Sequence, residues 1–304
     1  MYEETMREIV LQEMNEERFN RKHIDTKIRA EIEASQGMQA KLQQGVELVQ
    51  QFLAGPYYAS KARRLGQLAN VDLNTLVMDM FVGVSYSLRP ELFTSVTAQM
   101  AARLNFSDHT DAITTVAELL AVLCQTDAFD ITKESKMASL TVVSRMPLSD
   151  NLIAFIEDSE YLPPMVCEPL DLTHNHSSGY LTHNDSLILG AGNHHDGDLC
   201  LGVLNRLNKV AFKLDLDFLS QVEEEPTYDL DTQEKCDQWH RFKKQSYRFY
   251  SLMQQQGNRL YLTNKVDKRG RIYSCGYHIN PQGAAFKKAM LELAKEELVT
   301  GVLV

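Results

Sequence analysis

The residues best suited to bind a charged polymer form a short DKRGR segment that begins at Asp267. Arg269 and Arg271 lie on either side of Gly270, and a guanidinium group can hold a phosphate through two parallel hydrogen bonds. A glycine between them lets the backbone approach a phosphate closely. Asp267 can orient one arginine, and Tyr273 supplies an aromatic ring nearby. A tight structural turn closed by an Asp–Arg pair would have the same residues.

A second polar motif follows at Asn280-Pro281-Gln282-Gly283. It predicts a rigid turn before a last helix over residues 284–298, whose N-terminus would favour an anion. Asn280, Gln282 and Gly283 are therefore candidate binding residues beside the DKRGR segment.

Basic residues are concentrated in the segment from Trp239 to Lys288, although the whole chain has a net charge of −10. The segment contains one acid, Asp267, and eleven basic residues, so its net charge is +10 and the rest of the chain carries −20. The basic residues are Arg241, Lys243, Lys244, Arg248, Arg259, Lys265, Lys268, Arg269, Arg271, Lys287 and Lys288. This asymmetry is typical of a polyanion-binding surface on an acidic body, and the alternative is a solvated helix face.

Histidines gather in a loop-like region, with aspartates and cysteines nearby, so a metal site has to be considered. The histidines are His174, His176, His183, His194 and His195. Their spacing matches neither a helical HExxH pair nor a CxxC knuckle. We therefore expect no metal ligand in this chain, and a metalloenzyme built on this cluster is a minor alternative.

The first half of the sequence predicts helices that would pack on one another. Residues 1 to about 145 combine good helix formers with apolar residues at near-helical spacing. The apolar positions of the first stretch are Ile9, Val10, Met14, Phe19, Ile24, Ile28 and Ile32. Asp72 is expected to cap a helix that Arg89–Pro90 ends, and residues 111–123 form a further helix.

The second half predicts a more mixed structure. Residues 162–197 are rich in Pro, Gly, His and Asn, which indicates short strands and ordered loops. A helix is expected over 199–221 and a second, basic one from Asp231–Thr232 to about Gln256, together forming a helical hairpin. Strands at 260–262 and 272–275 would flank a turn at 267–270.

Several classes of protein are excluded by composition. The chain has 304 residues, 44% of them apolar, which is too apolar for a disordered protein. No run of about 20 apolar residues is present, and the acidic N-terminus does not resemble a signal peptide. Five scattered cysteines without a CxxC pair favour a reduced, cytosolic protein.

The order of several motifs resembles the phage- and mitochondrial-type single-subunit DNA-dependent RNA polymerases. The pattern DxRGRxY is followed seven residues later by NPQG and then by LxLAKxE. Upstream, LPPMVCEPL, SGYLT and LILG resemble the end of that family's N-terminal domain, and NRLNKVAFKLDLDFL resembles the first thumb helix. The resemblance covers about 162–298, in the family's order.

The resemblance implies where nucleic acid would bind. In that family the DxxGR segment begins the palm and contacts the template strand and the RNA–DNA hybrid. The matching positions are Asp267, Arg269, Gly270, Arg271 and Tyr273, supported by Asn280, Gln282 and Gly283. The basic helix, with Lys243, Lys244 and Arg248, corresponds to the thumb.

The same resemblance predicts that the catalytic groups lie elsewhere. The family's two metal-binding aspartates and the Lys and Tyr of its fingers come after NPQG, whereas only residues 284–304 follow here, without an aspartate. Two-metal phosphoryl transfer needs such carboxylates. We therefore expect no catalytic residue in this chain, and a second polymerase subunit that carries the remaining palm, the fingers and Mg²⁺.

The expected protein is thus one subunit of a heterodimeric bacteriophage RNA polymerase that binds template DNA and the RNA transcript, without a membrane, in the cytoplasm of an infected bacterium. The expected fold is mainly α with a small β component. Expected domains are a helical N-terminal domain over 1–198, a thumb-like hairpin over 199–258 and the start of a palm over 259–304. The alternatives are a non-catalytic regulatory module with half of a polymerase fold, and a fragment of a longer polymerase.

Overall fold

The structure is a computed structural model that describes residues 2–104, 106–133, 139–190 and 193–295. It is mainly α-helical with a small β component, as the sequence predicted. Contacts divide the chain into two compact units: unit 1 contains Met1–Asn20 and Ser159–Val304, and unit 2 contains Arg21–Asp158. This division by contacts differs from the predicted domains, whose boundaries at 198 and 258 stay predictions.

Unit 2 is a helical body with one small sheet. Its helices are α2 (Arg21–Ala34), α3 (Gln36–Leu53), α4 (Ala59–Leu65), α5 (Leu73–Ser85), α6 (Phe93–Ala101), α7 (His109–Leu123) and α8 (Asp150–Asp158). The sheet has the order β1-β3-β2 and is antiparallel, with β1 (Glu91–Leu92), β2 (Phe129–Lys133) and β3 (Leu140–Ser144). The sequence did not predict this sheet.

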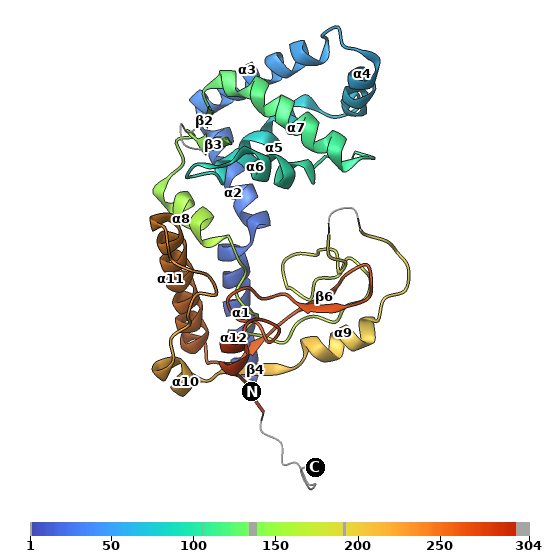
Figure 1. Cartoon of the computed structure of the whole chain (residues 1–304). Helices are drawn as coiled ribbons and strands as arrows, with labels where there is room; N and C mark the ends of the chain where they lie inside the picture. Colours follow the sequence, from blue (N-terminus) through green and yellow to red (C-terminus); the bar gives the residue numbers. More distant parts are fainter. Residues whose placement is uncertain (1, 105, 134–138, 191–192, 296–304) are drawn as a thin grey trace. The chain divides into compact units, whose positions relative to one another are not determined.

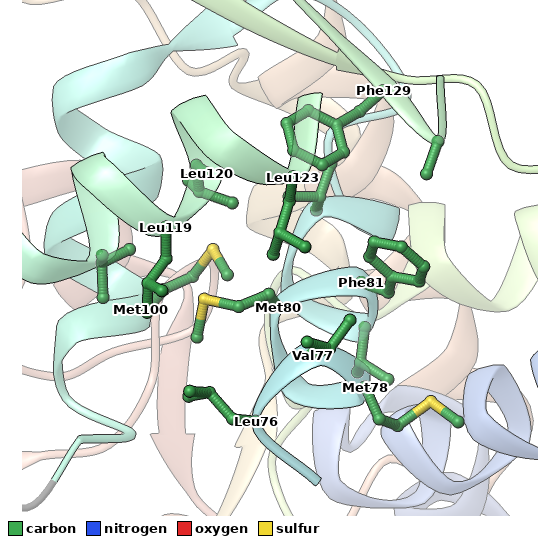
Figure 2. Packing of buried hydrophobic residues seen from close by; sticks show 14 of the residues in the cluster. Leu76, Val77, Met78, Met80, Phe81, Met100, Leu119, Leu120, Leu123 and Phe129 are labelled. Atoms are coloured by element: carbon green, nitrogen blue, oxygen red, sulfur yellow. The ribbon is translucent and has the colours of Figure 1, made fainter. Parts of the chain in front are cut away.

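The core of unit 2 forms where α3, α5, α6 and α7 pack together (Figure 1). Helix α5 is apolar on nearly every side, and Val77, Met80 and Phe81 are fully buried between the neighbouring helices (Figure 2). Asp72 caps this helix as predicted, because its carboxylate accepts a hydrogen bond from the Thr75 amide at 2.8 Å. The helix ends at Ser85, four residues before the predicted stop.

Unit 1 combines helices with two small sheets. The helices are α1 (Tyr2–Phe19), α9 (Leu201–Asn208), α10 (Leu216–Gln221), α11 (Gln233–Gln255) and α12 (Ala285–Ala289). The strands are β4 (Ala211–Leu214), β5 (Leu260–Tyr261), β6 (Asn264–Val266), β7 (Ile272–Ser274) and β8 (Leu291–Leu293). One sheet has the order β5-β4-β8 and the other pairs β6 with β7, all antiparallel.

Two helices of unit 1 run side by side (Figure 1). The rings of Phe19 on α1 and Phe249 on α11 are 5.5 Å apart, and Asn15 and Gln256 exchange hydrogen bonds at 2.8 and 3.0 Å. Helix α11 confirms the predicted long helix: Thr232 caps its start, and Gly257 follows its end with a φ of +105°.

Two helix predictions in unit 1 were wrong. Instead of one helix over 199–221, α9 and α10 are separated by β4, so the first arm of the expected helical hairpin is broken. Instead of a helix over 284–298, α12 ends at Ala289 and β8 follows; residues 296–298 lie outside the described residues. Both differences have one cause, because β8 pairs with β4 through Phe212↔Leu293 and Leu214↔Leu291.

The loop region before α9 is ordered by isolated pairings and not by strands. Met165 forms an antiparallel bridge with Tyr261, and Ile188 forms a parallel bridge with Val266. The short strands predicted within 162–197 therefore exist only as these bridges in the described part of the region. Among the described helices of both units, none is long and apolar enough to cross a membrane.

Candidate nucleic-acid interface

The DKRGR segment forms the tip of the β6–β7 hairpin. The predicted turn at 267–270 is present, but the strand that pairs with β7 is β6, whereas residues 260–261 form β5 in the other sheet. The Asp267 amide donates to the Arg271 carbonyl at 2.9 Å, and the Gly270 amide donates to the Asp267 carbonyl at 2.8 Å. Gly270 has a φ of +79°, which other residues adopt only with strain.

Asp267 organises both arginines of the tip. One carboxylate oxygen accepts from the backbone amides of Arg269 and Arg271 at 2.9 and 3.0 Å. The other accepts from Arg271 Nε at 2.8 Å and Nη2 at 2.7 Å, and lies 3.4 Å from Arg269 Nε. Burial raises the pKa of Asp267, but the hydrogen bonds and the charge of Arg271 outweigh it and hold this pKa below its usual value.

The two guanidinium groups remain accessible although Asp267 orients them. The side chain of Arg269 is 65% exposed and that of Arg271 is 53% exposed, whereas that of Asp267 is only 15% exposed. Arg271 also lies 5.6 Å from the centre of the Tyr273 ring, which is itself partly exposed. The tip is therefore a structural turn that also presents two fixed positive charges to solvent.

The NPQG residues hold backbone together. Asn280 Nδ2 donates to the Ser274 and Gly276 carbonyls at 3.2 and 2.5 Å, and its Oδ1 accepts from the Gln282 amide. Gln282 accepts from the Ser274 amide at 2.8 Å and donates to the Ile272 carbonyl at 3.1 Å, as a neighbouring strand would. Their side chains thus brace β7; a direct contact with nucleic acid stays a prediction.

Two glycines in this region differ in their importance. A Cβ on Gly276 would lie 2.0 Å from the Ile279 carbonyl oxygen, so only glycine fits there. Sequence reasoning missed Gly276, although a glycine five residues after Arg271 was visible. A Cβ on Gly283 would meet mainly the flexible Lys287 side chain, at 2.8 Å.

The basic residues of α11 have different surroundings. Lys243 forms an ion pair of 2.7 Å with Glu223, which accounts for the raised pKa of the lysine. Lys244 and Arg248 are exposed. Two of these three predicted thumb residues therefore lie on the surface, and the third has an acidic partner.

A buried histidine joins α11 to the segment after β7. His278 is 3% exposed, and its Nδ1 lies 2.7 Å from Ser246 Oγ. Aromatic rings surround it, with Tyr161, Phe242 and Phe249 centred 5.1–5.3 Å away. Burial lowers the pKa of His278 to about 4, with a smaller contribution from the charge of Lys287. This neutral histidine fixes the segment after β7 to the basic helix α11.

A cavity of ≈570 Å³ lies beside this junction. Its wall includes the aromatic residues Tyr161, Trp239, Phe242 and Tyr277, and Lys287 Nζ lies 5.0 Å from the centre of the Tyr277 ring. The sequence did not reveal this cavity, because its residues come from five separate segments.

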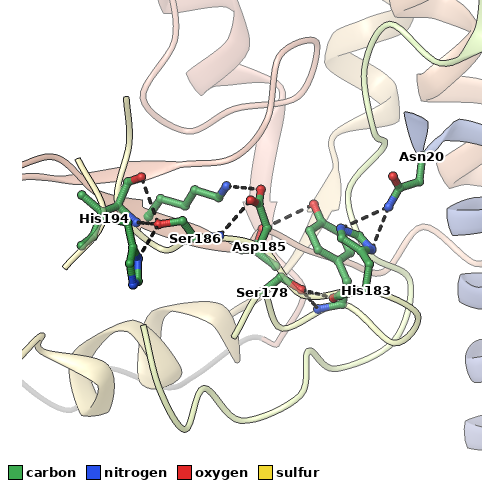
Figure 3. Close-up of polar contacts among 10 residues, drawn as sticks. Asn20, Ser178, His183, Asp185, Ser186 and His194 are labelled. Atoms are coloured by element: carbon green, nitrogen blue, oxygen red, sulfur yellow. Dashed lines mark hydrogen bonds and ion pairs between the residues drawn. The ribbon is translucent and has the colours of Figure 1, made fainter. Parts of the chain in front are cut away.

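The five histidines of the loop region do not form one cluster. His183 contacts Asn20 at 2.7 Å (Figure 3). It also lies 3.6 Å from buried Glu16. His174 Nδ1 accepts from the His176 amide, and His195 Nδ1 accepts from the Gly197 amide. The structure brings together His176, His194 and Asp196, whose potential ligand atoms all lie within 4.8 Å of one another.

Glu16 is the main polar contact between α1 and this loop region. It is fully buried and accepts from the Leu181 and Thr182 amides at 2.9 and 2.8 Å and from Gln12 Nε2 at 2.9 Å. Burial alone would raise the pKa of Glu16, but His183 and these donors lower it to about 2. Sequence reasoning treated α1 as an ordinary helix and missed this residue.

Comparison with known proteins gives a partial similarity. No protein-family model matches the chain. The chain is similar to a probable DNA-directed RNA polymerase of Gelasinospora sp. (strain G114), with 28% identity over 144 residues. The match covers 43% of this chain and 17% of that protein, so the chain spans only a small part of its relative. The similarity supports a relationship to DNA-directed RNA polymerases, which are nucleotidyltransferases.

Proposed function

We propose that this chain is the template-gripping subunit of a two-chain, phage-type DNA-directed RNA polymerase. It would bind template DNA and the RNA–DNA hybrid, while a partner chain carries the catalytic aspartates and the fingers. The proposal rests on the ordered motifs of the sequence and on the partial similarity to an RNA polymerase. It places the protein in the cytoplasm of an infected bacterium, in transcription early or midway through infection.

The observation that carries the proposal is the arrangement of the hairpin tip. Arg269 and Arg271 are held in fixed positions by one carboxylate and are more than half exposed. They lie within a segment of net charge +10. Fixed guanidinium groups lose little side-chain entropy when they bind phosphate, so this tip suits a nucleic-acid backbone.

Mg²⁺ belongs to the partner chain in this proposal. In the part of the chain that the structure describes, one group of three potential metal ligands occurs, formed by His176, His194 and Asp196. Mg²⁺ prefers oxygen ligands, and two imidazoles do not suit it. In this proposal the contribution of this chain is to bind and orient the polymer.

The binding test compares Arg271→Ala and Arg271→Lys with wild type, using a labelled RNA–DNA hybrid over a series of salt concentrations. Loss of one phosphate contact should lower the slope of log K against log salt by about 1, with a similar loss on all template sequences. The lysine variant should recover binding only in part, because it keeps the charge but not the two parallel hydrogen bonds.

The matched control is Arg206→Ala, which removes an exposed arginine of unit 1 outside the basic segment. It should leave the slope unchanged. If Arg271→Ala also leaves the slope unchanged, the arginine has only a structural role, which is to hold the turn together through its hydrogen bonds to Asp267.

The two-chain proposal is tested by purifying the chain from its native source and identifying the proteins that accompany it. A partner with two separate aspartates and a fingers Lys/Tyr pair should restore nucleotide incorporation with Mg²⁺ and template. Incorporation by this chain alone would contradict the proposal. If the chain binds the hybrid but no polymerase partner accompanies it from the native source, the regulatory module is favoured.

A further inference from the structure

We propose that His176, His194 and Asp196 bind one divalent transition-metal ion of the zinc class. The imidazole rings of the two histidines are centred 3.5 Å apart. His194 Nε2 lies 3.1 Å from a carboxylate oxygen of Asp196. The three residues come from two loop segments that are eighteen residues apart, so the spacing in the sequence does not reveal the group. The proposal is independent of the polymerase function.

The potential ligand atoms lie about as close together as the ligands of one metal ion do. Ligand atoms at about 2.0–2.1 Å from a tetrahedral zinc lie roughly 3.4 Å from one another. The pair formed by His194 and Asp196 is already near this distance, and no pair in the group exceeds 4.8 Å. The side chain of Asp196 is 94% exposed, so it is able to rotate toward a shared ion.

Buried groups hold the two loop segments in place. Asn175 is 8% exposed, and its amide nitrogen donates to the His195 carbonyl at 2.7 Å and to the Gly197 carbonyl at 2.8 Å. This side chain ties the segment that carries His176 to the one that carries His194 and Asp196. The backbone around the three ligands is therefore fixed without a metal.

His194 also has the second contact that metal-binding histidines usually have. Its Nδ1 lies 3.3 Å from Ser186 Oγ, and Ser186 Oγ in turn accepts from the Ile188 amide at 3.1 Å (Figure 3). When the ion is bound, a hydrogen bond from Nδ1 to Ser186 Oγ would leave the Nε2 lone pair for the metal. Such outer contacts orient the ring and fix its tautomer.

The donor set selects the class of metal. Two imidazole nitrogens and one carboxylate oxygen suit Zn²⁺, Co²⁺ or Ni²⁺, whereas Ca²⁺ and Mg²⁺ take oxygen ligands. The role expected of the ion is structural, because the segment that includes Ser186 continues into residues 187–189, which pair with β6. The Val266 amide donates to the Leu187 carbonyl, and the Leu189 amide donates to the Val266 carbonyl, both at 2.8 Å.

The experiment is a Zn²⁺ titration of the full chain, purified without a histidine tag, in competition with a chromophoric chelator. Wild type should bind one equivalent, and Co²⁺ should give the visible spectrum of a four-coordinate site. His176→Gln, His194→Gln and Asp196→Asn should each weaken binding by tenfold or more. The matched controls are His174→Gln and His195→Gln, in the same loops, which should bind as wild type does.

Thermal unfolding separates loss of a ligand from loss of the fold. Without metal, the three ligand variants should unfold at the wild-type temperature, and only wild type and the controls should be stabilised by Zn²⁺. The proposal is overturned if wild type binds no equivalent of Zn²⁺, if the ligand variants bind as tightly as wild type, or if the controls lose binding equally.

Discussion

The buried histidine at the junction of α11 and the hairpin predicts a specific loss of stability in mild acid. The pKa of His278 falls from 6.5 to about 4 on folding, because burial disfavours the imidazolium form. Between these two pH values the unfolded chain binds a proton and the folded chain does not. The free energy of unfolding should therefore fall as the pH drops from about 6.5 to about 4, and this loss is complete below that range.

The size of the effect follows from the pKa shift. A change of about 2.5 pKa units at about 1.4 kcal/mol each corresponds to roughly 3 kcal/mol at pH 4. Glu16 acts in a lower range, because its stabilising effect is lost only as the pH falls from 4.5 toward 2. The two groups can therefore be separated by pH.

The assay is urea unfolding between pH 7 and pH 4, followed by the fluorescence of Trp239. This is the single tryptophan of the chain, and it stacks on Phe242, which itself lies against the His278 ring. His278→Phe keeps an aromatic ring but removes the titrating group. Between pH 7 and pH 4 the free energy of unfolding should therefore fall by about 3 kcal/mol less in this variant than in wild type. His240→Phe is the matched control, since His240 is exposed on α11, next to Trp239 in the sequence. Equal pH dependence in wild type and His278→Phe would refute the reasoning.

Three further changes have defined outcomes. Gly276→Ala should lower the free energy of unfolding in urea by about 1–3 kcal/mol, because its Cβ would overlap a backbone carbonyl. Gly202→Ala, whose Cβ would meet nothing within 4 Å, should not lower it, and equal effects of the two changes would contradict this reasoning. Glu16→Gln should destabilise the chain by about 3 kcal/mol at pH 7 and much less at pH 2, so an equal loss at both pH values would show that the charge is unimportant. Gln282→Ala removes two hydrogen bonds at the edge of β7 and should lower the protection of the Ser274 amide in hydrogen exchange by about tenfold, and unchanged protection would exclude this bracing role.

The parts of the fold that local sequence determines were predicted well. The Asp72 and Thr232 caps, the long helix α11 and the turn at 267–270 each depend on neighbouring residues, and the structure contains them. Both helix errors in unit 1 come from the sheet β5-β4-β8, whose strands are far apart in the chain. Residues 211–214 and 291–293 continue helical patterns in the sequence, but in the structure their backbone hydrogen bonds are made between the two strands and not within a helix.

The first helix shows a second limit of pattern reading. Val10 and Met14 were expected on the buried side of α1, yet they are 49% and 60% exposed. Phe19 is buried as expected, but polar residues are buried with it: Gln12 and Glu16 in α1 accept hydrogen bonds from loop amides, and Asn20, which follows the helix, contacts His183. No periodicity in the sequence can show that a helix will bury polar side chains against a loop 150 residues away.

The candidate binding residues show the same limit. The DKRGR tip is local, so its charge and turn could be read directly from the sequence. The partners of Lys243 and the bracing role of Gln282 depend on three-dimensional neighbours, and the sequence did not indicate them. The group of His176, His194 and Asp196 was hidden because two loops have to meet to form it.

The way in which the chain leaves unit 1 at Asn20 and returns at Ser159 has a consequence for synthesis on the ribosome. Unit 2 is one continuous segment, so it is able to complete its core as soon as residues 21–158 have emerged. Helix α1 is made first but has to wait for residues 166 and 181–182, and then for α11, before its buried polar groups are satisfied. During that interval α1 exposes Glu16 and its neighbours to water, where they are well solvated. The polar part of this packing face reduces the apolar surface that the waiting helix exposes, whereas a wholly apolar face would invite aggregation of the nascent chain.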